Sequence, residues 1–167
     1  MAETEELVDA PPFEDWQRRV AGTNISAKTL LATDYLNHFN EIIMLLGMVA
    51  DMPELLEDCR DWRPRSYPNH FRESGFSDRE LAIAAYTHVP DRYRKPFEET
   101  IEQMNAVVET SLSLLGDAAA AGEPAVLADK AQTAVAVLQR LQDHASAIIH
   151  GSEHIMNQTE IDGLLGR

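Results

Sequence analysis

The fold of this chain is decided by one stretch near its C-terminus, LADKAQTAVAVLQRLQDHASAII, residues 127–149. Its apolar positions alternate steps of four and three residues, at Leu127, Ala131, Ala134, Leu138, Leu141, Ala145 and Ile148. This spacing is typical of a helix that packs lengthwise against another helix. We therefore predict a long helix whose apolar seam contacts a second helix, either of this chain or of a second copy in a homodimer.

The segment before this stretch supplies a partner helix. Pro96 suits the first turn of a helix, and apolar residues then recur at helical spacing to about Leu115. Their positions are Phe97, Ile101, Met104, Val108, Leu112 and Leu115. Residues 116–124, rich in alanine and containing Gly122, predict the turn between the two helices. We predict an all-α fold, an antiparallel helical bundle built on a long αα-hairpin.

Shorter helices are predicted upstream of the hairpin. Ser26 suits the N-cap of a helix over residues 26–50, Pro53 begins a short helix to about residue 59, and a capping box begins a helix over 77–88. We expect residues 60–76 to form a long connection, held against the bundle by aromatic side chains. These are Trp62, Tyr67, Phe71 and Phe76.

The chain divides into three parts by composition. Residues 1–23 are acidic and contain Pro11-Pro12, which predicts a largely disordered N-terminus with at most one helical turn at Phe13, Trp16 and Val20. Residues 24–156 carry the helical patterns of the bundle, and residues 157–167 form a short C-terminal peptide.

Composition excludes several classes of function. The formal net charge of −14 repels nucleic-acid phosphates and anionic lipids, so we expect neither nucleic acid nor membrane as a partner. Cys59 is the one cysteine, which excludes an internal disulfide. The N-terminus lacks the pattern of a signal peptide, and the longest apolar run, residues 42–50, is shorter than the roughly 20 residues that a membrane helix needs. We predict a cytoplasmic protein.

The C-terminal peptide has an amphipathic pattern. Ile161, Leu164 and Leu165 share one face at helical spacing, while Glu160 and Asp162 are polar. A helix this short is marginal alone and gains stability when its apolar face lies in a groove. That groove belongs either to another protein or to the bundle of the chain itself.

The pattern Gln158-x-Glu160-Ile161-Asp162-x-Leu164-Leu165 resembles two known peptides. One is the SQ-x-EIDALL element of the flagellar motor switch protein, and the other is the C-terminal peptide of the chemotaxis phosphatase family CheZ. In both families the peptide docks on the phosphorylated receiver domain of a response regulator. The resemblance implies that residues 157–167 are a docking peptide and that a receiver domain is the partner. The implied contact residues are Gln158, Glu160, Ile161, Asp162, Leu164 and Leu165.

The catalytic segment of the phosphatase family, DFQD-x-TGQ, is absent from this sequence. Other receiver phosphatases carry an acid and an asparagine three residues apart on one helix, where the amide orients a water in line with phosphorus. Two pairs here resemble that arrangement, Asp34/Asn37 and Glu102/Asn105. We favour Asp34 and Asn37 as the catalytic pair, because His38 and Glu41 continue a polar strip on an otherwise apolar helix. Alternatively, this strip faces solvent or hydrogen-bonds within the bundle.

The histidines raise a metal hypothesis. His150, Glu153 and His154 lie within one turn of each other and form a workable set of nitrogen and oxygen ligands, to which His38 and Glu41 could add. The repeated Glu-x-x-His pattern of di-iron bundles is missing, and histidines are common near helix ends. These residues are weak candidates, and we predict neither a metal nor another cofactor.

The resemblance implies a regulator of a phosphorylated receiver domain in chemotaxis or another two-component pathway, built on a helical bundle. It would bind the receiver through its C-terminal peptide and either hydrolyse the aspartyl phosphate or only sequester the receiver. The alternatives are a metal-binding, di-iron-like bundle and a non-catalytic scaffold or dimerisation protein.

Overall fold

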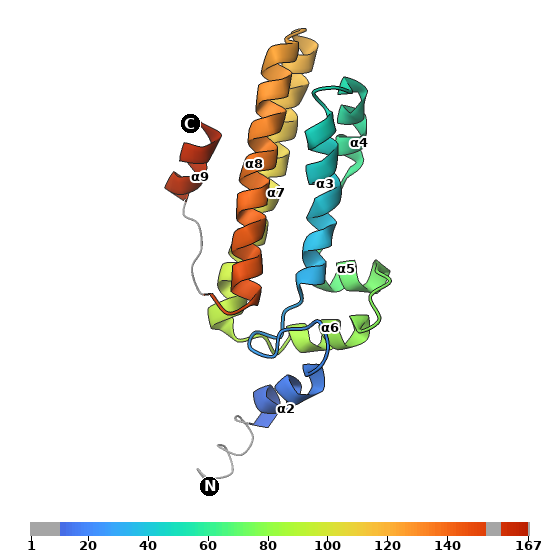
Figure 1. Cartoon of the computed structure of the whole chain (residues 1–167), viewed down its shortest axis with the longest axis vertical. Coiled ribbons are helices and arrows are strands. Elements are labelled where there is room, and N and C mark those ends of the chain that lie inside the picture. The colour runs from blue at the N-terminus through green and yellow to red at the C-terminus, as the bar shows by residue number, and fades with distance from the viewer. Residues whose placement is uncertain (1–10, 153–157, 167) are drawn as a thin grey trace.

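The predicted hairpin forms the long axis of the molecule (Figure 1). A computed structural model describes residues 11–152 and 158–166 of the chain. Helix α7 (Asp91–Ala120) and helix α8 (Pro124–Ile149) lie side by side and antiparallel. Every seam residue of α8 named above is buried. The all-α fold and the hairpin are therefore confirmed. The apolar seam of α8 packs against other helices of the same chain.

Helix α7 begins five residues before its predicted start at Pro96. The carbonyl of Pro90 accepts the backbone N–H groups of Tyr93 and Arg94, each at 2.9 Å, and so opens the helix. Pro96 lies inside the helix, where its missing N–H removes one backbone hydrogen bond near the N-terminal end. Burial of Tyr93 together with Phe97 on one face favours the longer helix.

Helix α7 also continues beyond its predicted end at Leu115, through the alanines to Ala120. Gly116 does not end the helix as expected. A Cβ at Gly116 would lie 2.8 Å from a guanidinium nitrogen of Arg60, so this glycine leaves room for that side chain. The turn is made instead by Gly122, whose φ of +67° suits glycine.

The third long element starts later than predicted. A 3₁₀ turn η1 (Thr33–Leu36) leads into α3 (Asn37–Met48), which packs on α8. Residues 26–32 are not helical, because Leu30 has a φ of +66° and the Ser26 side chain accepts the N–H of Lys28 in a tight loop. This loop carries Leu30 into the core, where the side chain is fully buried.

The short helices cover the remaining faces of the bundle. As predicted, Pro53 begins helical structure, which consists of η2 (Pro53–Leu55) and α4 (Leu56–Asp61). The expected connection over 60–76 contains a helix, α5 (Tyr67–Glu73), because Ser66 caps it and Pro68 sits in its first turn. Trp62, Tyr67 and Phe71 are buried and Phe76 packs against the core, so the aromatic attachment is confirmed.

Helix α6 (Arg79–Tyr86) follows α5 and packs against it. The helix itself is confirmed, but the predicted capping box does not begin it: Asp78 is the N-cap residue and makes no side-chain capping bond. Helix α2 (Pro11–Val20) forms in the N-terminal part that we expected to be mostly disordered, and Val20 at its end is fully buried. Helix α9 (Gln158–Leu165) packs on α8, across that helix from α3 in Figure 1.

One continuous core joins these elements. Cys59 on α4 lies fully inside it, and burial, with the nearby charge of Asp58, raises the pKa of its thiol to about 11. The described helices include none that is both long and apolar enough to cross a membrane.

Candidate functional site

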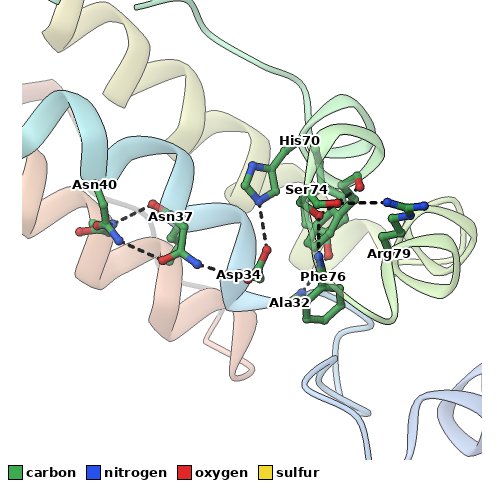
Figure 2. Close-up of polar contacts among 12 residues, drawn as sticks. Ala32, Asp34, Asn37, Asn40, His70, Ser74, Phe76 and Arg79 are labelled. Atoms are coloured by element: carbon green, nitrogen blue, oxygen red, sulfur yellow. Dashed lines mark hydrogen bonds and ion pairs between the residues drawn. The ribbon is translucent and has the colours of Figure 1, made fainter.

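Asp34 and Asn37, the favoured acid–amide pair, lie where η1 becomes α3. The side-chain nitrogen of Asn37 donates a hydrogen bond to Asp34 Oδ1 at 3.2 Å (Figure 2). Asp34 is half-buried and Asn37 is exposed. The spacing of three residues therefore brings the two side chains together on one face, as predicted.

A histidine that the sequence did not suggest completes this pair. His70 Nε2 on α5 lies 3.1 Å from Asp34 Oδ2 (Figure 2). His70 is buried, with 8% of its surface exposed, so its ring is held in place. His70 reaches Asp34 because the chain forms a helical turn from Ser66 to His70. We had expected this segment to be a connection without a helix.

The pair is also connected to the long hairpin through two amides. Asn40 donates to Asn37 Oδ1 at 3.0 Å, and Gln142 on α8 donates to Asn40 Oδ1 at 2.9 Å. We call His70, Asp34, Asn37, Asn40 and Gln142 the polar network. Because α5, α3 and α8 all contribute to it, the packing of three helices fixes the positions of Asp34 and Asn37.

His38, expected beside this pair, faces the interior instead. Its ring stacks on Trp62 with centroids 4.6 Å apart, and its Nε2 accepts the backbone N–H of Arg65 at 3.0 Å. Burial, aided by the charges of Arg65 and His70, lowers the pKa of His38 to about 4. His38 is therefore neutral at pH 7, while Glu41 remains on the exposed side of the helix.

The polar network has the groups needed to hold a water molecule. Asn37 uses one N–H toward Asp34 and one lone pair toward Asn40, and an amide has a second of each. Asn37 is exposed, so a partner protein can reach it. An amide held in this way can orient a water, while the Asp34 carboxylate keeps the amide in position.

The second acid–amide pair, Glu102 and Asn105, lies on α7 and lines a different pocket. Asn105 Oδ1 is buried, and no described residue donates a hydrogen bond to it. The structure therefore does not bring the two acid–amide pairs into one site.

The C-terminal peptide lies in part against its own bundle. Ile161 is 2% exposed, Leu165 is half-buried against the core, and Leu164 is 41% exposed. Of the two grooves that the sequence left open, Ile161 therefore occupies one on the chain's own bundle. Leu165 borders a pocket of about 400 Å³ between α7 and α8, whose lining includes the exposed Leu114, so α9 covers apolar surface of the hairpin.

The polar positions of the peptide are described to different extents. Asp162 is half-buried. Gln158 and Glu160 belong to α9, but their side chains lie outside the described part of the structure.

Of the C-terminal metal candidates, the structure describes His150 alone. His150 is exposed at the C-cap of α8, while Glu153 and His154 lie outside the described residues. Among the described residues, no group of three or more histidine, cysteine, aspartate or glutamate side chains could hold a metal ion.

Comparison with protein-family models, with curated proteins and with solved structures finds no match to this chain.

Proposed function

We propose that this protein regulates a phosphorylated receiver domain, which it binds through α9. The observation that carries the proposal is the pattern of residues 158–165, which resembles the receiver-docking peptides of two families and forms a helix with Leu164 exposed. We also propose a cytoplasmic location, in keeping with the acidic composition and the single, buried cysteine.

The proposal requires α9 to leave the surface of α8 and to bind the receiver domain instead. Ile161 belongs to the docking face implied by the resemblance, yet it is buried against the chain's own bundle. A receiver groove that takes Ile161 therefore competes with α8, and the apparent affinity is the intrinsic affinity multiplied by the fraction of molecules in which α9 is undocked. Exposed Leu164 would make the first contact.

The polar network is the proposed site of any effect on the phosphoryl group. Asn37 is exposed, and Asp34 and His70 hold it in place, which are the requirements for placing a water in line with phosphorus. A bound receiver that never reaches Asn37 would instead be sequestered without hydrolysis.

Docking can be tested by titrating a labelled receiver, with and without a phosphoryl mimic, with the intact protein. We expect Leu164→Ala to weaken binding about tenfold, as for the loss of an interface anchor. Met48→Ala is the matched control, because Met48 is similarly exposed but lies on α3, across α8 from α9. An absence of wild-type binding at high micromolar concentration would reject the proposal.

Hydrolysis can be tested by following receiver dephosphorylation. Asn37→Ala should slow the reaction by about 10²-fold if its amide positions the attacking water. Asn24→Ala, at an exposed position outside the polar network, is the control. Equal rates for wild type, Asn37→Ala and buffer would leave only a binding role.

The burial of Ile161 favours a second candidate, a scaffold in which α9 is a permanent structural cap. In that case a variant ending at residue 156 should lose several degrees in Tm, since about 1 kcal/mol corresponds to roughly 2–4 °C at this chain length. Addition of a receiver would then leave the Tm of the full chain unchanged.

A further inference from the structure

A pocket of about 350 Å³ lies between the first half of α7 and the segment that leads into α5. Its volume is within the range of small-molecule sites, roughly 300–1,000 Å³. Neither the polar network nor α9 takes part in it. The aromatic wall of the pocket consists of Tyr35, Tyr67, Tyr86 and Phe97.

The aromatic wall is packed into a fixed arrangement. Tyr67 stacks on Tyr86 with centroids 4.5 Å apart and meets Phe97 edge to face at 5.9 Å. The phenol oxygen of Tyr67 accepts the N–H of Ala32 at 2.9 Å, and the Tyr35 hydroxyl donates to the carbonyl of Arg65 at 2.6 Å. Tyr35, Tyr67 and Phe97 are almost fully buried, so their rings form a fixed apolar floor of the pocket, whereas the Tyr86 ring is partly exposed.

The opposite wall comes from one face of α7 and carries acceptors. Glu98, Glu102 and Asn105 follow each other at spacings of four and three residues and all line the pocket. Glu98 is held by a 2.7 Å hydrogen bond from the Tyr86 hydroxyl, and Asn105 Oδ1 is buried without a described donor.

The charge around the pocket favours a cation. Arg65 also lines the pocket, but its Nε is paired with Glu73 at 3.0 Å, which offsets its charge. The two glutamates lie within a chain of net charge −14, which attracts cations and repels anions.

We propose that this pocket binds a small organic cation, an ammonium group carried on an aromatic or aliphatic body. The partly exposed ring of Tyr86 would pack against the body and attract the cation through its π electrons. Glu98 and Glu102 would balance the charge and accept hydrogen bonds from the ammonium group. Glu102 would thus be a ligand-binding residue rather than half of a hydrolytic pair.

The test is a titration of the intact protein with three probes of similar shape, followed by calorimetry and by ¹H–¹⁵N NMR. The probes are 2-phenylethylamine, 2-phenylethanol and 3-phenylpropanoate. We expect saturable binding of the amine, at least about tenfold weaker binding of the alcohol, and no binding of the carboxylate. Equal affinity for amine and alcohol, or no saturation by the amine, would overturn the proposal.

A pair of charge-matched variants places the site. Glu98→Gln/Glu102→Gln should weaken amine binding by at least about tenfold and abolish the preference over the alcohol. Glu99→Gln/Glu109→Gln removes the same charge from exposed positions of α7 that do not line the pocket, and should bind like wild type. Equal losses in both double variants would assign the effect to overall charge, which would also overturn the proposal.

Discussion

Thr29 shows how a single hydroxyl ties two distant segments together. The side chain is fully buried, and its Oγ1 donates to the carbonyl of Ile149 at the end of α8 at 2.5 Å. A carbonyl in the last turn of a helix lacks a partner within that helix, so this hydroxyl satisfies a group that burial would otherwise penalise.

Thr29→Val should therefore lower the free energy of unfolding by about 1–2 kcal/mol, because it keeps the shape and leaves the Ile149 carbonyl without its donor. Thr87→Val is the control: the Thr87 hydroxyl also donates to a helix carbonyl, that of Ala84, but in an exposed position. Urea unfolding of both variants measures the difference, and equal losses would contradict the assignment.

His38 makes the stability of the fold depend on pH. Its pKa is about 4 in the folded chain, below the ordinary value of 6.5, so the unfolded chain binds the proton more tightly. Stability should be complete above pH 6.5 and fall by up to about 2 kcal/mol between pH 6.5 and 4, after allowance for partial solvation.

Urea unfolding at several pH values should show this slope in wild type and a smaller one in His38→Gln, whose side-chain oxygen can still accept the Arg65 N–H. The exposed His150→Gln should keep the wild-type slope. An undiminished slope in His38→Gln would show that other groups cause it.

At the same scale, the sequence could predict the Asp34–Asn37 contact but not the one with His70. Residues three apart on one helix share a face, whatever the rest of the molecule does. His70 reaches Asp34 from a position 36 residues away, on a helix that itself was not predicted. Such a contact depends on how α5 packs, which local spacing does not encode.

At the scale of elements, the seam of α8 supplies many of the buried side chains of the core. Leu138→Ala should destabilise the fold by about 2–5 kcal/mol, because the side chain is fully buried and its removal leaves a cavity. Gln139→Ala, at the next and exposed position, should change the stability by less than about 0.5 kcal/mol. Thermal or urea unfolding compares the two variants, and similar losses would show that α8 is not packed as described.

The limits of helices were harder to predict than their existence. Periodicity identified α7, α8 and most of α3, because long amphipathic patterns need a core to face. It placed the start of α3 too early, since the positive φ of Leu30 is set by the burial of its loop. It also took Pro96 as a helix start, although one lost hydrogen bond is tolerated when Tyr93 and Phe97 are both buried.

At the scale of the whole molecule, the described helices share one core and should unfold together. Trp62 reports on the junction of α4 and α5, whereas far-UV circular dichroism is dominated by the long helices. In Trp16→Phe, which leaves Trp62 as the one tryptophan, both probes should give the same urea midpoint. Two separate midpoints would mean that the short helices open independently of the hairpin.

The burial of Cys59 has a practical consequence. A thiol that is shielded from solvent and keeps its proton at neutral pH reacts slowly with maleimides and other thiol reagents. The wild-type chain should therefore react little with thiol reagents, so the native cysteine adds little background to chemical labelling. A cysteine introduced at Leu164 would take a fluorophore or spin label selectively, and movements of the C-terminal helix could be followed in real time without first replacing the native thiol.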